Sequence, residues 1–232
     1  MAHPASRLAL AVLVSVTLSS SAARADGPTW PAIKATTAWE HLSDRDHDDA
    51  GSISVHVAEI AGVKCLKGEA VTPGKADVYL AVAKDIKAAM SWSKAGLKYS
   101  EVLGTGASTI DYFQYLDVPG WTGASDRFWF LRGTTESGGG QMTFWWDRMG
   151  ERGGPHNARF EEVVAQNPSA VEPPLNVGGW SFMQDGANVR SRYYVCSDTG
   201  GVLPKALQYA AAKQTLPDTV GDLVREAIKR SN

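Results

Sequence analysis

The feature that most constrains the fold is a series of strand-like runs that ends in one long helical pattern. Residues 52–57 alternate Ser and His with Ile and Val, as a strand with one buried face does. Residues 61–71 follow after a turn at Gly62, so the two runs predict a hairpin. Four more strand-like runs follow, at residues 108–116, 127–132, 141–147 and 180–182, separated by loops that contain Gly or Pro.

Turn and helix signals complete the pattern. Asp185-Gly186 predicts a two-residue hairpin turn, after which residues 189–196 return as a strand. Apolar residues at spacings of three and four predict helices over residues 76–90 and from Leu203 to the C-terminus, with a kink or restart at Pro217. Strands in succession with helices in the middle and at the end predict an α+β domain, in which a long C-terminal helix covers one face of an antiparallel sheet and can enclose a cavity.

The N-terminal segment is typical of a secretory signal peptide. Residues 1–7 carry one positive charge, residues 8–18 are apolar except for Ser15 and Thr17, and Ala23-Arg24-Ala25 fits a cleavage site. A membrane-spanning helix would need about 20 apolar residues. We therefore predict a signal peptide over residues 1–25, a single domain over residues 26–232, and export to the periplasm or the medium.

Composition excludes several classes of function. A net charge of -2 argues against a nucleic-acid partner, and 44% hydrophobic residues argues against disorder. Residues 44–51 resemble half of a calcium loop, but Ala50 and Val57 stand where oxygen ligands are required, so we interpret this stretch as a solvated loop. Without metal-ligand spacing among the histidines or a nucleophile motif, the sequence predicts no metal, cofactor or catalytic residue.

Aromatic residues are the most informative side chains. The chain has eight tryptophans, and strand runs carry many phenylalanines and tyrosines, although such residues more often simply fill a core. Arg132 shares a strand face with Phe128 and Phe130, where an unpaired charge would be costly. It should therefore contact a polar ligand group or a carboxylate, for which Asp111 and Asp117 are candidates. Alternatively, Arg132 ends its strand and reaches water at Gly133.

The C-terminal half carries a recognisable set of motifs. In order, they are Gly178-Gly179-Trp180-Ser181-Phe182, Asp185-Gly186, Tyr193-Tyr194-Val195 and Ser197-Asp198-Thr199-Gly200-Gly201-Val202-Leu203-Pro204 before a helix. This set resembles START-type (StAR-related lipid-transfer) domains of the helix-grip superfamily, of the exported bacterial type. A weaker match upstream involves residues 51–55, Trp92 and residues 118–127, so the resemblance covers about residues 30–232. The pair Asp126-Arg127 departs from the family, which usually has Arg-Asp.

The resemblance implies a helix-grip fold, in which a curved antiparallel sheet wraps around the C-terminal helix and a tunnel holds one hydrophobic molecule such as a lipid or sterol. It also implies that this helix and the loop at residues 117–125 gate entry, and that Arg132 matches an interior arginine of the family. We expect Trp121 in that loop to contact a membrane surface transiently, since indole suits the interface. The expected ligand-binding residues are Arg132, Phe128, Phe130, Phe144, Trp146, Tyr112, Leu203 and Leu207.

The two cysteines, Cys65 and Cys196, are expected to be free thiols. Export favours a disulfide, but the resemblance implies that the first strand lies between the strands that carry these residues. Two strand spacings amount to about 9–10 Å, more than the roughly 7 Å between Cα atoms that a disulfide spans.

The leading functional hypothesis is non-enzymatic binding of a hydrophobic ligand, for transport or sensing. One alternative is a cyclase-type enzyme, since the resemblance extends to enzymes of this architecture. The other is an interaction module whose interior is filled by its own aromatic side chains.

Overall fold

The computed structural model describes residues 27–118, 124–198 and 205–231, so the predicted signal peptide, Trp121 and Leu203 lie outside the described residues. The strands are β1 (Glu40–His47), β2 (Gly51–Ile60), β3 (Val63–Pro73), β4 (Leu97–Thr105), β5 (Thr109–Leu116), β6 (Arg127–Gly138), β7 (Gln141–Arg148), β8 (Leu175–Asp185) and β9 (Asn188–Asp198). The helices are α1 (Trp30–Ala35), α2 (Ala76–Lys84), α3 (Ala89–Trp92), α4 (Asn157–Gln166) and α5 (Lys205–Ser231), with a 3₁₀ segment, η2 (Glu151–His156), before α4.

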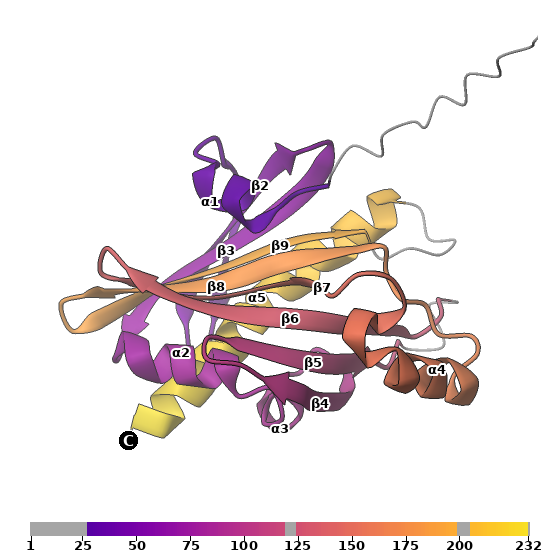
Figure 1. Cartoon of the computed structure of the whole chain (residues 1–232). Helices are drawn as coiled ribbons and strands as arrows, with labels where there is room; N and C mark the ends of the chain where they lie inside the picture. Colours follow the sequence, from indigo (N-terminus) through magenta and orange to yellow (C-terminus); the bar gives the residue numbers. More distant parts are fainter. Residues whose placement is uncertain (1–26, 119–123, 199–204, 232) are drawn as a thin grey trace, which may run out of the picture.

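The described strands form one antiparallel sheet in the order β1-β2-β3-β9-β8-β7-β6-β5-β4 (Figure 1). The predicted hairpins β2–β3 and β8–β9 are confirmed. Gly62 and Gly186 adopt positive φ in their turns, as do Gly139 and Gly140 between β6 and β7. Positive φ is readily accessible to glycine, which explains why the chain reverses at these positions.

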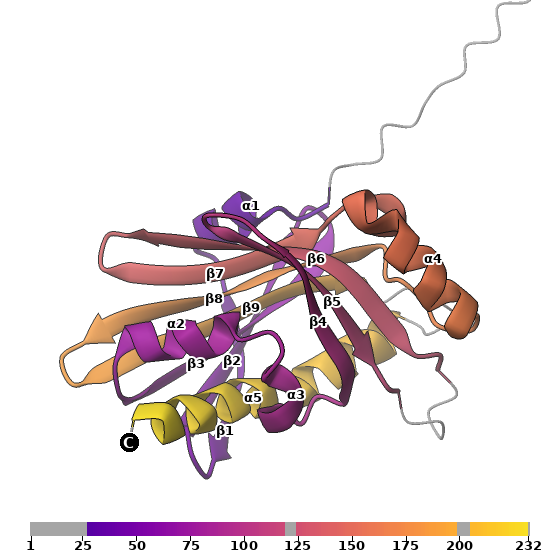
Figure 2. The same cartoon turned by 60° about the horizontal axis from the view of Figure 1, so that its bottom comes forward.

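Helices cover both faces of the sheet (Figure 2). We call the face covered by α2, α3 and α5 the inner face, and the face toward α1 and α4 the outer face. α5 packs along β1, β2, β3 and β9, and its C-terminal part also contacts α2 and α3. The architecture is therefore the predicted α+β arrangement, in which a curved antiparallel sheet grips a long C-terminal helix.

The C-terminal part of α5 is packed tightly against the sheet. Leu216, Val220, Leu223 and Val224 are fully buried or nearly so. A Cβ atom on Gly68 of β3 would lie 2.9 Å from Cγ2 of Val220 and would overlap Leu216 as well, so glycine at this position lets the helix approach the strand closely. The helix continues through Pro217, and the predicted restart there does not occur.

Several elements differ from the sequence predictions. The helix predicted over residues 76–90 is divided into α2 and α3, because the chain leaves helical geometry at Asp85. The acidic stretch at residues 44–51 is partly strand, since β1 extends to His47 before a turn leads into β2. Within the described chain, no cluster of three His, Cys, Asp or Glu residues could hold a metal ion.

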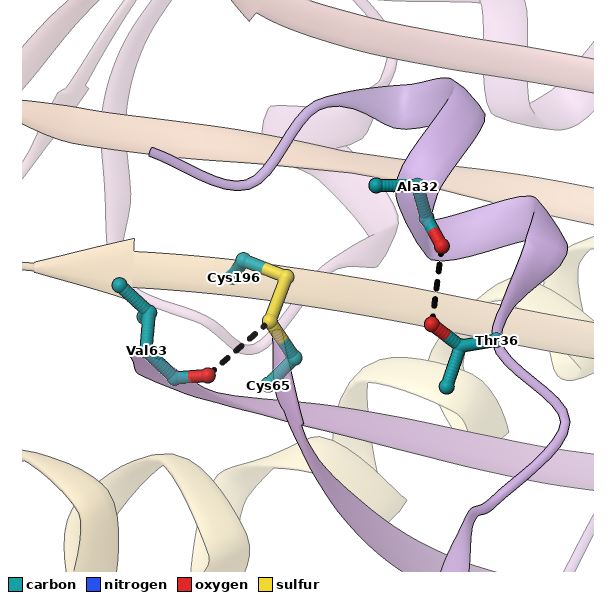
Figure 3. Close-up of a disulfide and its surroundings, with 5 residues drawn as sticks. All are labelled: Ala32, Thr36, Val63, Cys65 and Cys196. Carbon is teal, nitrogen blue, oxygen red and sulfur yellow. Dashed lines mark hydrogen bonds between the residues drawn. A yellow bond between two sulfur atoms is a disulfide. The ribbon is translucent and has the colours of Figure 1, made fainter. Parts of the chain in front are cut away.

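Cys65 and Cys196 form a disulfide, so the prediction of two free thiols is wrong (Figure 3). The error lies in the strand order, because β3 pairs directly with β9 and no strand separates them. The two cysteines are opposite each other in this register, with Cα atoms 4.3 Å apart. That separation is well below the roughly 7 Å beyond which two cysteines cannot be bridged.

Candidate functional site

A continuous row of aromatic side chains crosses the inner face from β5 to β9. The ring centroids of Tyr112 and Phe144 are 6.5 Å apart, and those of Phe144 and Trp146 are also 6.5 Å apart. Tyr193 lies 5.9 Å from Trp146 and 4.5 Å from Trp180. We call these five residues the aromatic floor, and their spacing is that of rings in mutual contact.

Two glycines make room for rings of the floor. A side chain on Gly133 of β6 would overlap the Phe144 ring on the neighbouring strand. On β8, a Cβ atom at Gly178 would lie 2.7 Å from the indole of Trp146. The absence of a side chain at each glycine therefore lets a large ring from the neighbouring strand pack directly over the strand backbone.

The aromatic floor and the neighbouring Trp129 carry several hydrogen-bond donors. Burial raises the pKa of the Tyr112 phenol, and burial raises that of Tyr193 as well, so both stay protonated near neutral pH. Trp146 donates its indole N–H to Oδ1 of Asn176 at 3.0 Å. Nε1 of Trp129, on the same face, is buried and has no hydrogen-bond partner among the described residues. Such a surface suits a mainly apolar ligand that carries an acceptor oxygen.

Arg127, at the start of β6, is the buried guanidinium of this region. Only 4% of the residue is exposed, and its Nη1 donates to the backbone oxygens of Ser125 and Asp126. Desolvation lowers the pKa of Arg127, although an arginine remains charged at any physiological pH.

Asp126 joins the end of β5 to the start of β6. Tyr115 donates its hydroxyl to Oδ2 of Asp126 at 2.7 Å, and the backbone N–H of Val118 donates to Oδ1 at 2.9 Å. The Val118 hydrogen bond is the main cause that lowers the pKa of Asp126. The carboxylate follows the predicted gating loop at residues 117–125 and therefore ties the end of this loop to Tyr115, just before it, and to Val118, near its start.

The structure separates the predicted ligand-binding residues into two groups. Tyr112, Phe144 and Trp146 lie together in the aromatic floor. Phe128 and Phe130 point to the opposite, outer face, where they pack under α4 against Phe160. Strand alternation correctly puts these two phenylalanines on one face, but it does not tell which face is the interior.

Arg132 also lies on the outer face. Its side chain is 48% exposed and donates from Nε and Nη2 to the two carboxylate oxygens of Asp111, at 2.7 and 2.8 Å. Asp111, one of the two predicted partners, also contacts Nε2 of His156 at 3.1 Å. The Arg132 hydrogen bonds are the main cause that lowers the pKa of Asp111.

The remaining predicted residues cannot be placed at the site. Leu203 and Trp121 lie outside the described residues, and so does the side chain of Leu207. The floor residues Trp180 and Tyr193 were not predicted as ligand-binding residues. Their alternation with outward-facing neighbours on β8 and β9 was the signal that could have found them.

Two pockets bounded by described residues lie away from the aromatic floor. One, of about 230 Å³, is on the outer face beside α1 and β7. The other, of about 340 Å³, lies between the β6–β7 turn and the N-terminus of α2. No floor residue lines either pocket.

Among the described helices, none is both long and apolar enough to cross a membrane.

No protein-family model and no curated protein matches this sequence. Solved structures do match its fold. A STAR-related lipid transfer protein from Xanthomonas axonopodis is 21% identical with a TM-score of 0.62, over 82% of this chain and 98% of that chain. Human StAR-related lipid transfer protein 5 is 13% identical with a TM-score of 0.67, over 85% and 90%. The chain has the START fold.

The START fold is not confined to lipid transfer proteins. The Zhui aromatase/cyclase from Streptomyces sp. R1128 is 11% identical with a TM-score of 0.52, over 72% of this chain and 95% of that chain. The START fold therefore confirms the predicted architecture, and function has to be argued from the residues of the inner face.

Proposed function

We propose that this protein binds one hydrophobic molecule, such as a lipid or sterol, between the aromatic floor and α5, and that it transports or senses this molecule without chemical change. The observation that carries the proposal is the aromatic floor itself, which spreads over β5 to β9 on the inner face. The same face of the sheet carries α5 (Figure 2). Burial of an acyl chain against such a surface contributes about 0.8 kcal/mol per CH₂ group.

The donors of the inner face define the polar end of the ligand. Trp129 Nε1 lacks a partner within the described structure, and the Tyr112 and Tyr193 phenols remain protonated. A carbonyl, hydroxyl or ester oxygen would accept hydrogen bonds from all three groups, whereas an ammonium could not satisfy the Trp129 N–H, which only donates.

Export of the protein is part of the proposal. The disulfide between Cys65 and Cys196 supports an oxidising compartment, where such bonds form and persist. Export is also what the N-terminal sequence predicts. Contact between Trp121 and a membrane surface remains a proposal as well.

An interaction module with a filled interior is the second candidate. Tyr112 and Phe144 are only 3% and 2% exposed, which favours rings that fill the interior themselves. A cyclase-type enzyme is favoured less. The floor phenols, with their raised pKa, can donate hydrogen bonds, but they would not act as bases near neutral pH.

A pair of tryptophan substitutions tests the proposal. Val195→Trp adds an indole beside the floor, and Thr134→Trp adds the same group to the outer face, as a matched control. Both variants and the parent are incubated with lipid vesicles, re-isolated, and analysed for bound lipid, and circular dichroism checks the fold. We expect the parent and Thr134→Trp to carry lipid and Val195→Trp to carry much less. No lipid on the parent, or equal loading of both folded variants, contradicts interior binding.

A further inference from the structure

The pocket of about 230 Å³ on the outer face has the composition of a binding site of its own. Its walls are the indoles of Trp30 and Trp145, three prolines and Leu175. The two indole rings are nearly parallel, with centroids 6.1 Å apart. We define this space as the Trp30–Trp145 pocket. It is separate from the interior site, since its walls come from the N-terminal segment and from β7, β8 and the residues before β8.

The pocket is built by local features of the sequence. Gly179 of β8 leaves the space in which the Trp30 ring lies, since a Cβ atom there would be 2.7 Å from that ring. Trp30 is almost completely buried and packs with the cluster that contains the disulfide. Trp145 is held by a hydrogen bond from its Nε1 to Oε1 of Glu136 at 2.9 Å. Both indoles are therefore fixed in place before any ligand arrives.

The charge at this pocket comes from Asp147. The other charged lining residue, Arg148, forms an ion pair with Glu172 at 2.8 Å and donates to the carbonyl oxygen of Pro174 at 2.9 Å. Asp147 has no ion-pair partner within 4.0 Å in the described part of the chain. Its cross-strand neighbour Arg132 directs Nε and Nη2 to Asp111 instead. The pocket thus combines indole rings with one carboxylate that forms no direct ion pair among the described residues, although the Arg132 guanidinium attracts it at longer range.

We propose that the Trp30–Trp145 pocket binds an organic cation of the quaternary ammonium class. Trp145 is only partly buried, and its indole and the Asp147 carboxylate together attract a cation, while the proline walls suit the methyl groups of that cation. A primary ammonium has three N–H groups to satisfy. Apart from the Asp147 carboxylate, the acceptors named here are already engaged, because Pro174 accepts from Arg148 and Oδ1 of Asn176 accepts from Trp146. Asp147 alone would therefore have to satisfy the three N–H groups of a primary ammonium. A quaternary ammonium has no N–H group, so it loses no hydrogen bond when it moves from water into the pocket. The site does not depend on ligand binding in the interior.

The cation could be a free small molecule or the head group of a lipid, and titration distinguishes these sources. The purified protein is titrated calorimetrically at pH 7.5 with choline chloride, with methylammonium chloride at equal ionic strength, and separately with phosphatidylcholine or phosphatidylglycerol vesicles. We expect saturable binding of choline in the millimolar range or of phosphatidylcholine vesicles, and weaker binding of methylammonium and phosphatidylglycerol.

Matched carboxylate variants decide whether this pocket is responsible. Asp147→Asn should weaken binding about tenfold, whereas Asp48→Asn, in the exposed turn after β1, should leave it unchanged. Circular dichroism confirms that both variants fold. The proposal would be overturned if neither choline nor phosphatidylcholine vesicles bound saturably. It would also be overturned if methylammonium bound as tightly as choline, or if Asp147→Asn bound as tightly as the parent.

Discussion

Cys65 and Cys196 are directly opposite each other on β3 and β9, with Cα atoms 4.3 Å apart. Their disulfide joins positions 131 residues apart in the sequence. It also lies in the cluster that receives Trp30, on the outer face of the sheet. The bond therefore links the N-terminal part of the sheet to the last strand before α5.

Removal of this disulfide should lower stability substantially. The double variant Cys65→Ala/Cys196→Ala loses the constraint on a long loop of the unfolded chain, and we expect the free energy of unfolding to fall by about 2–4 kcal/mol. Urea denaturation of the parent and the variant measures the difference. Treatment of the parent with a reductant should move its midpoint toward that of the variant. Reactive thiols in the unreduced parent would show that the bond is absent.

Gly133→Ala tests the packing of the aromatic floor. The added methyl overlaps the Phe144 ring, which has to shift, and we expect a loss of about 1–3 kcal/mol. Gly138→Ala on the same strand is the matched control, because nothing lies within 4 Å of its added methyl. Urea midpoints compare the two variants. Equal stability of the two would mean that the ring is not held against β6.

Arg132→Gln separates a role on the outer face from a role in ligand binding. Because Arg132 is paired with Asp111, away from the aromatic floor, the variant should take up lipid as the parent does. The pKa of Asp111 should rise in the variant, since the Arg132 hydrogen bonds lower it. Carboxyl NMR titration measures the pKa, and vesicle extraction measures uptake. Impaired lipid uptake by a folded Arg132→Gln variant would show that Arg132 takes part in ligand binding.

The same pair predicts a pH dependence of stability. The folded pKa of Asp111 lies below its unfolded value of about 3.9, so the stability from this pair is present above about pH 4 and is lost as the pH falls through the folded pKa. Since half of the Arg132 side chain is exposed, we expect the contribution to be below about 1 kcal/mol. Between about pH 4 and pH 2, Arg132→Gln should therefore lose less stability than the parent. An identical acid dependence of parent and variant would contradict this pairing.

The central part of the fold could be predicted from the sequence, and its edges could not. Hairpins at Gly62 and Gly186 have strong turn signals and clear alternation beside them. The edge strand β1 is polar on both faces, and none of its residues is buried. Its sequence therefore lacks the alternation of apolar and polar residues that reveals a strand. α4 was missed because Val163 is its only fully buried residue.

The site was predicted in part, for a related reason. Alternation divides the side chains of β6 into two sets, one for each face of the sheet. Helices cover both faces, so apolar residues occur in both sets. The sequence therefore does not tell which face carries Phe128 and Phe130. The disulfide required the pairing of β3 with β9, a contact between distant parts of the chain that no local pattern encodes.

Native mass spectrometry of the protein purified from its own host tests interior binding most directly. Spectra are recorded before and after gentle activation, and any released molecule is identified by its mass. The account predicts a bound fraction heavier than the chain by one lipid-sized molecule, and loss of that fraction in Val195→Trp but not in Thr134→Trp. A bare mass in all three proteins, with no uptake from vesicles, would contradict interior binding and favour a filled interior.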